Sequence, residues 1–284
     1  MPGFRLKPAL KPVLKPALSI LALSACGLAA PAGAQTLPEV RYWFEAQAYW
    51  PDVNTTVSIA GPNGNVGTKI DLESDLDLAD RKSLPAFQAG ARFGERWSLI
   101  GEYYGLNRSG SASVARDIVF DDVTYSTGAS VSSGFDTKVY RAAVGYSFLK
   151  RDHFEVGASL GLHVTQFKVT LSGQGHVGNA AASSELRKRD ALAPLPTLGL
   201  YGAYQITPRL MLGGRVDYLS LKVGDYDGRL TNTEARLSYR LLKNVAAGAA
   251  YRYVDYDLNI DKPHWQGEVA YKFKGPALFL QAVF

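Results

Sequence analysis

Val40-Arg41-Tyr42-Trp43-Phe44-Glu45-Ala46-Gln47-Ala48-Tyr49-Trp50 alternates between two kinds of side chain. Its even-numbered positions are all apolar, whereas the odd-numbered positions include an arginine, a glutamate and a glutamine. Successive side chains of a β-strand point to opposite faces, so this stretch is predicted to be a strand with one apolar face. The same alternation recurs at 87–93 and 139–148. The sequence therefore predicts an all-β fold.

The connections between these segments differ consistently in length. Short turns are expected at 94–96, 150–153, 207–209 and 243–244, and long polar loops at 51–84, 109–134 and 172–193. Short turns at one end and long loops at the other are typical of a transmembrane antiparallel up-and-down β-barrel. A soluble β-sandwich also alternates. The asymmetry of the turns and the aromatic residues at the strand ends favour the barrel, since aromatic side chains gather at membrane interfaces.

We expect about ten strands, within a range of roughly 8 to 12. They are 39–50, 85–93, 97–108, 136–149, 154–169, 196–206, 210–223, 229–242, 245–259 and 264–284. In the last segment the apolar positions change from odd to even near Gly275-Pro276. A turn there would make eleven strands, whereas a β-bulge would keep one long strand. We predict the bulge, because bacterial barrels have even strand numbers.

The charge of the chain belongs mostly to its first 34 residues. The sequence has 31 Lys+Arg and 26 Asp+Glu, a formal charge of +5. Residues 1–34 hold four of the basic residues and no acid, which leaves 27 basic against 26 acidic residues in 35–284. Residues 35–284 are therefore nearly neutral, and their charge gives no reason to expect nucleic-acid binding.

Residues 1–34 have the layout of a cleaved secretory signal peptide. A basic segment precedes an apolar core at 17–30, and small residues follow, with cleavage expected after Ala34 in the Ala32-Gly33-Ala34 sequence. The core is too short for a membrane anchor. Cys26 lies in a segment that resembles the lipobox of bacterial lipoproteins, an alternative cleavage site. If cleavage follows Ala34, residues 35–284 form the barrel domain, which contains no cysteine.

Leu278, Leu280 and Phe284 occupy alternate positions at the end of the chain. This pattern resembles the C-terminal signature of bacterial outer-membrane proteins and implies recognition by the barrel assembly machinery. With the leader and the alternation, the sequence resembles the small OmpA-like or OmpW-like barrels of the cell outer membrane. The resemblance implies contact with outer-membrane lipid and lipopolysaccharide, and a monomer.

If the apolar positions face lipid, the opposite positions place many charges inside the barrel. These are Arg41, Glu45, Arg92, Glu102, Arg141, Glu155, Arg215, Asp217, Glu234, Arg236, Arg240, Arg252, Glu268 and Lys272. We expect them to form a lumen charge network, because a charge facing lipid, or buried without a partner, is costly. Such a network would fill a narrow barrel. The alternative is that its slight basic excess lines a narrow path for small solutes.

One long loop contains alternating carboxylates at Asp71, Glu73, Asp75 and Asp77. As a strand, it would place them on one face and could bind a cation. It could instead form a solvated hairpin with residues 56–60, or turn inward to meet the basic residues of the lumen. Asp121-Asp122 is expected at a hairpin tip above the membrane, as ordinary turn residues.

No recognisable catalytic motif accompanies the four histidines. Only His163 is expected to face the interior, and a single inward histidine is more often a hydrogen-bonding residue than a catalyst. The predicted function is therefore non-enzymatic, with an envelope-structural or surface-interaction role, no cofactor and no metal. A narrow porin-like channel and an outer-membrane lipid hydrolase are the alternatives.

Overall fold

The computed structural model describes residues 40–61, 67–177, 180–262 and 265–284. The predicted signal peptide, with Cys26, Ala32 and Ala34, lies outside these residues. Within the described ranges, no helix is long and apolar enough to cross a membrane. The regular structure described consists of β-strands.

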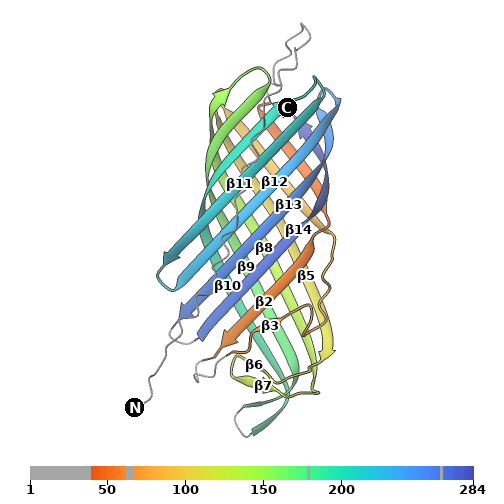
Figure 1. Ribbon diagram of the computed structural model, residues 1–284, viewed down its shortest axis with the longest axis vertical. Helices are drawn as coiled ribbons and strands as arrows, with labels where there is room; N and C mark the ends of the chain where they lie inside the picture. The colour runs from red at the N-terminus through yellow and green to blue at the C-terminus, as the bar shows by residue number, and fades with distance from the viewer. Residues whose placement is uncertain (1–39, 62–66, 178–179, 263–264) are drawn as a thin grey trace, which may run out of the picture. The chain divides into compact units, whose positions relative to one another are not determined.

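Ten long strands form a closed antiparallel ring (Figure 1). In ring order they are β1 (Tyr42–Tyr49), β4 (Leu84–Phe93), β5 (Trp97–Ser113), β8 (Ser130–Lys150), β9 (Phe154–Val177), β10 (Ala180–Gln205), β11 (Leu210–Val223), β12 (Tyr226–Leu242), β13 (Val245–Lys262) and β14 (Trp265–Val283). β14 pairs back onto β1 and closes the barrel. The predicted ten-stranded barrel is confirmed.

β2 (Asp52–Ala60) continues β1 along the same neighbour. Tyr49 pairs with Ala277 and Asp52 pairs with Lys274, so the register on β14 runs unbroken past Pro51. The backbone N–H of Trp50 donates to the Pro276 carbonyl at 3.0 Å. Pro51 has no N–H to donate and separates two segments of what is otherwise one strand.

The two ends of the barrel differ, as the loop lengths predict. The turns after β4, β8, β10 and β12 are short and lie at the end where the Arg41 N–H donates to the Phe284 carbonyl at 2.8 Å. This short-turn end carries the C-terminus in Figure 1. The longer connections, before β4 and between β5 and β8, lie at the opposite, long-loop end. The long loop predicted at 172–193 is wrong, because β9 extends to Val177, β10 begins at Ala180, and the two strands pair as a long hairpin through this stretch.

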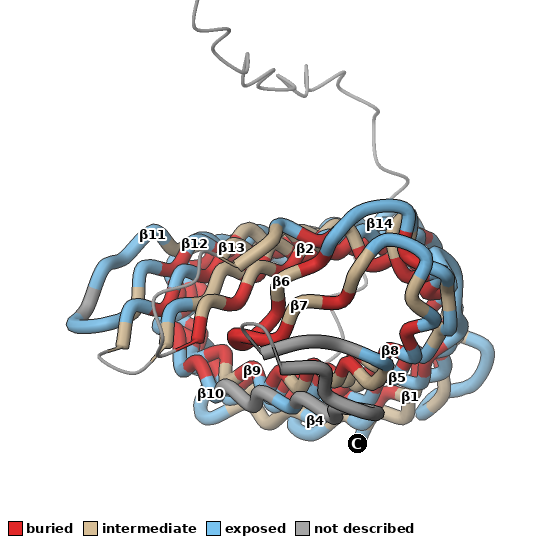
Figure 2. Tube along the Cα trace, turned by 90° about the horizontal axis from the view of Figure 1, so that it is seen from below, coloured by how far each residue is buried: buried red, intermediate tan, exposed pale blue. Residues whose placement is uncertain are grey.

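Three short strands fold inward at the long-loop end. β3 (Ile70–Asp71) pairs with β2, and β6 (Ile118–Phe120) pairs with β7 (Val123–Tyr125). Figure 2 shows β6 and β7 inside the outline of the ring. Asp121 and Asp122 form the tip between them, both with positive φ, as a tight two-residue hairpin turn requires. The predicted hairpin is confirmed, but its tip is buried and donates the Asp121 N–H to the Ile59 carbonyl.

The apolar face of β14 changes sides along the strand. Near the short-turn end the outward residues Leu278 and Leu280 are apolar and exposed, whereas further along the inward residues Tyr271 and Phe273 are apolar and buried. The register with β13 is unbroken through this region. The predicted bulge at Gly275-Pro276 is therefore wrong. The sequence pattern shifts because the apolar partner changes from the exterior of the barrel to its interior.

Other strands show the same switch, which divides the barrel into two halves. Exposed apolar side chains near the short-turn end form the outward belt: Tyr42, Phe44, Phe93, Trp97, Leu99, Tyr140, Val144, Phe148, Leu160, Leu198, Leu200, Tyr204, Leu237, Tyr239, Leu278 and Leu280. Buried apolar side chains near the long-loop end form the inner core: Val53, Val57, Ile59, Ile70, Leu72, Leu76, Phe120, Val123, Tyr125, Phe135, Phe167, Val169, Leu171, Val254, Leu258, Ile260 and Val269. The long-loop half thus packs like a soluble protein, with polar side chains outside and apolar side chains inside.

Candidate functional site: a filled barrel interior

Glu102 lies at the centre of the charges inside the barrel. Its carboxylate accepts hydrogen bonds from Arg215 Nη2 at 2.8 Å and from Arg252 Nη2 at 2.5 Å. The side chains of Glu102 and Arg252 are only 3% and 1% exposed. β5, β11 and β13 present these residues from separate parts of the ring, so the ion pairs bridge the interior.

Five further residues join this centre. Glu234 Oε2 lies 3.6 Å from Arg215 Nη2 and 3.4 Å from Arg252 Nε. The other contacts are Arg215 to Asp217 at 3.4 Å, Arg141 to Asp217 at 2.9 Å, Arg236 to Glu234 at 3.5 Å and Arg236 to Glu45 at 2.5 Å. We call these eight residues the central network. Its four arginines and four carboxylates balance in charge.

Arg92 and Glu155 form a second, separate pair near the short-turn end. Arg92 donates Nη1 and Nη2 to the two carboxylate oxygens at 2.9 and 3.0 Å. This two-point geometry suits a guanidinium and a carboxylate. Ser147 also donates to Glu155 and lies 2.9 Å from the Tyr201 hydroxyl.

Four residues predicted for the lumen network lie elsewhere. Arg41 is exposed and Arg240 is partly exposed, both at the short-turn end. Glu268 and Lys272 are on the outer wall, where they pair with Lys69 at 2.9 Å and with Asp255 at 3.5 Å. The prediction for Glu268 and Lys272 was wrong because the apolar face of β14 changes sides between these residues and the short-turn end.

Aromatic rings cover the central network on the side of the long-loop end. The guanidinium of Arg252 lies 5.5 Å from the ring centre of Tyr49 and 5.0 Å from that of Tyr104. Tyr104 contacts Phe273, and Phe273 contacts Tyr271 with ring centres 4.0 Å apart. All four rings are buried. We call Tyr49, Tyr104, Tyr271 and Phe273 the aromatic layer.

The inner core continues from the aromatic layer to the long loops. Phe135 and Phe167 contact Tyr271 with ring centres 5.4 and 6.1 Å away. The turn after β3 contributes Leu72 and Leu76, which are at most 1% exposed. Because this turn and the β6–β7 hairpin supply much of the inner core, the long loops close the barrel from within.

One ion pair inside the long-loop half is absent from the sequence prediction. Arg108 is fully buried and donates to Glu73, to Thr55 Oγ1 at 2.5 Å and to the Ala79 carbonyl at 3.2 Å. Arg108 shares the inward-facing positions of β5 with Glu102 and Tyr104, which was the available signal. Glu73 thus turns inward and meets a basic residue. An inward turn toward basic residues was one of the three alternatives for this loop.

The predicted cation cluster does not form. Asp71 ends β3 and residues 72–76 form a turn, so the four carboxylates do not share one face of a strand. Asp71 accepts from the Ser74 N–H, Asp75 pairs with Arg116 at 2.8 Å, and Asp77 has a positive φ. Among the described residues, no group of three or more His, Cys, Asp and Glu side chains could hold a metal ion.

A cavity of about 250 Å³ occupies the interior near the short-turn end. Val40 and Val283 line it at the mouth, and Arg141, Arg215 and Asp217 line it at the depth of the central network. The side chains of Arg141 and Asp217 are 4% and 2% exposed. The central network therefore forms the closed end of the cavity.

His163 lies in the barrel wall and faces the interior. It is 2% exposed and lies 3.5 Å from Thr197 Oγ1 and 3.4 Å from Asn232 Nδ2. Both of these hydrogen-bond partners are uncharged, and Arg141 of the central network is the cross-strand neighbour of His163 on β8. This arrangement is that of a hydrogen-bonding residue in a packed interior, in keeping with its expected role.

The predicted C-terminal assembly residues are all exposed. Leu278, Leu280 and Phe284 are 56%, 57% and 67% exposed, on the outer side of β14 and at the chain end. Their side chains form part of one continuous apolar edge at the short-turn end, together with the outward belt.

Three features together define an integral outer-membrane β-barrel. The ring of strands is closed, the outward belt is apolar, and the short turns lie at the same end as both termini of the barrel. The sequence matches the family described as outer membrane protein beta-barrel domain over residues 18–273. The chain belongs to this family and is located in the outer membrane. The belt thus faces lipid, and the short-turn end is the periplasmic one.

The chain is also similar to solved structures of outer-membrane proteins. The outer membrane protease OmpT from Escherichia coli is 11% identical, with a TM-score of 0.50, over 89% of this chain and 100% of that chain. The translocator domain of autotransporter NalP from Neisseria meningitidis is 12% identical, with a TM-score of 0.44, over 87% and 90%. Ail, the attachment invasion locus protein of Yersinia pestis, is 11% identical, with a TM-score of 0.31, over 84% and 99%. Comparison with curated proteins gave no match.

Proposed function

We propose that the protein is a closed, non-enzymatic outer-membrane barrel with an envelope-structural or surface-interaction role. The observation that carries this proposal is the filled interior. The central network, the aromatic layer and the inner core follow one another from the periplasmic cavity to the extracellular loops. The central network and the inner core combine mostly buried side chains from strands all around the ring, whereas the aromatic layer comes from β1, β5 and β14.

The electrostatics of the interior argue against a solute path. A channel for anions or cations would present charges to water, whereas the arginines and carboxylates of the central network are directed at one another. Their charges balance, so the basic excess expected from the sequence is absent from the central network. The aromatic layer and the inner core, with the paired Arg108 and Glu73, then separate it from the extracellular side. A hydrated ion that entered these buried zones would lose its water without compensation.

A lipid hydrolase needs an activated nucleophile at the level of the lipid headgroups. His163 is buried in the interior and its hydrogen-bond partners are Thr197 and Asn232, so it does not activate a nucleophile at that level. We further propose that the protein acts as a monomer without a cofactor. Leu278, Leu280 and Phe284 are proposed to engage the barrel assembly machinery during insertion, because their apolar side chains face outward.

Conductance in planar lipid bilayers tests the closed barrel. The purified protein is expected to give no current steps above background, because the interior offers no continuous aqueous path. An open porin reconstituted in the same way controls for insertion. Current steps whose ion selectivity changes in Arg141→Ala would show that the interior conducts and would overturn the proposal.

The hydrolase alternative has its own measurement. Mass profiles of lipid A from cells with and without the protein are expected to be identical. Loss of an acyl chain that depends on the protein would establish an enzyme in place of a structural barrel.

A further inference from the structure

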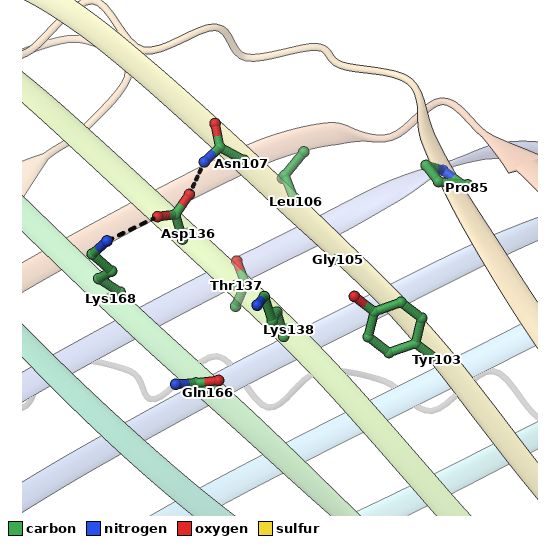
Figure 3. A pocket seen from close by; sticks show the side chains of 10 residues that line it. All are labelled: Pro85, Tyr103, Gly105, Leu106, Asn107, Asp136, Thr137, Lys138, Gln166 and Lys168. Atoms are coloured by element: carbon green, nitrogen blue, oxygen red, sulfur yellow. Dashed lines mark hydrogen bonds and ion pairs between the residues drawn. The ribbon is translucent and has the colours of Figure 1, made fainter.

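A groove of about 390 Å³ lies on the outer wall of the barrel, across β4, β5, β8 and β9 (Figure 3). Seven of its ten lining residues have polar side chains, among them Tyr103, Asn107, Asp136, Lys138 and Lys168. In Figure 3, Asp136 lies between Asn107 and Lys168, with an interaction to each. The inward-facing central network contributes no residue to this groove.

The groove lies at the upper edge of the outward belt. Tyr103, Tyr140 and Val164 are paired across β5, β8 and β9, and they are the last apolar outward residues on these strands. The next outward ladder is Gly105, Lys138 and Gln166, and the one after it is Asn107, Asp136 and Lys168. Three adjacent strands thus change from apolar to polar at one register. This line marks the level where lipid headgroups begin, on the extracellular side of the membrane.

The groove carries a local excess of positive charge. Lys138 and Lys168 line it, and Lys82 donates its ammonium to the carbonyl of Asn107 at its rim. Lys138 lies diagonally across the β8–β9 ladder from Lys168, a spacing that lets two side chains meet one ligand. Asp136 is the only carboxylate among the lining residues, and it is 3.8 Å from Lys168.

Gly105 forms part of the floor. A Cβ atom at this position would lie 3.2 Å from the Thr137 carbonyl oxygen and 3.7 Å from Lys138 Cγ. A larger side chain would therefore occupy the space in front of the lysines. The absence of a side chain here, between Tyr103 and Asn107 on the same face, keeps the groove open.

We propose that this groove binds the phosphate-bearing headgroup of an outer-leaflet lipid, with the acyl chains against the outward belt. Lys82, Lys138 and Lys168 contact the phosphate as flexible point charges. Tyr103 and Tyr140, whose ring centres are 5.0 Å apart, support the headgroup at the interface. The site depends on the membrane location of the barrel and adds a lipid partner to the proposed envelope role. It does not depend on whether the interior conducts.

Native mass spectrometry of the folded protein in detergent micelles tests this site with lipid A that carries two phosphates. The wild type is expected to retain one lipid A, and Lys82→Ala/Lys138→Ala/Lys168→Ala is expected to bind roughly 100-fold more weakly, at about fivefold per lysine near an anionic headgroup. Gly105→Leu fills the groove without changing its charge and is expected to weaken binding too. Lys222→Ala/Lys272→Ala/Lys274→Ala removes three lysines from other outer-wall strands and is expected to bind as the wild type does.

Heat-modifiable gel migration shows that each variant is folded before its binding is compared. Dephosphorylated lipid A is expected to bind as weakly as the triple groove variant, and millimolar inorganic phosphate is expected not to displace lipid A. Equal binding by wild type and groove variant, or by the two forms of lipid A, would contradict the site. Displacement by inorganic phosphate would assign the groove to free phosphate instead of a lipid.

Discussion

Glu102→Ala is expected to lower the free energy of unfolding by about 3 to 5 kcal/mol, the usual cost of removing one partner from a buried ion pair. Glu102 accepts from both Arg215 and Arg252, so its loss leaves two guanidinium groups short of a carboxylate. Arg252 is buried beneath the aromatic layer and cannot turn toward water. Urea titration in detergent micelles, followed by tryptophan fluorescence, measures the change.

Glu268→Ala is the matched control, because it removes a carboxylate from an ion pair on the outer wall. Glu268 and Lys69 are 44% and 63% exposed, and such pairs contribute less than about 1 kcal/mol. If both variants lower the stability equally, the central network is accessible to water, and the closed interior proposed above is wrong. If only Glu102→Ala does so, the network holds opposite walls of the barrel together.

The strand positions could be predicted from the sequence because alternation is a local signal. The segment that contains Tyr42 and Phe44 shows a strand regardless of what covers its apolar face. What covers that face is decided by height in the barrel, which the alternation does not report. In β14 the same apolar pattern meets lipid at Leu280 and the aromatic layer of the barrel interior at Tyr271. A change of parity was therefore interpreted as a bulge when it marks the edge of the membrane.

The sequence predicts only part of the central network, because alternation does not report the height of a residue in the barrel. Residues within the membrane-spanning half, such as Arg141 and Asp217, follow the rule that charges avoid lipid, and they do pair inside. Lys272 lies above the belt, where a charge faces water on the outer wall. The Arg108 pair with Glu73 depends on a loop folding back into the barrel. Such contacts between distant segments leave no periodicity in the sequence.

Phe167→Ala is expected to lower the free energy of unfolding by about 3 to 5 kcal/mol, because truncating a buried phenylalanine leaves a cavity that a packed interior cannot fill. Phe167 is 1% exposed and contacts Phe135, Tyr256 and Tyr271 with ring centres 5.2 to 6.1 Å away. Its neighbour Gln166 faces the outer wall on the same strand. Urea titration in detergent micelles measures the stability of Phe167→Ala and of its control variant, Gln166→Ala.

Gln166→Ala is expected to change the stability by less than about 0.5 kcal/mol, as exposed substitutions usually do. The comparison separates adjacent residues on opposite faces, so it tests which face of β9 is packed above the belt. A cost below about 1 kcal/mol for Phe167→Ala would mean that water reaches the long-loop half of the interior. The inner core would then not close the barrel, and a passage from the extracellular side down to the aromatic layer would have to be considered. A large cost confined to Phe167 instead requires that the extracellular half stays packed without support from lipid.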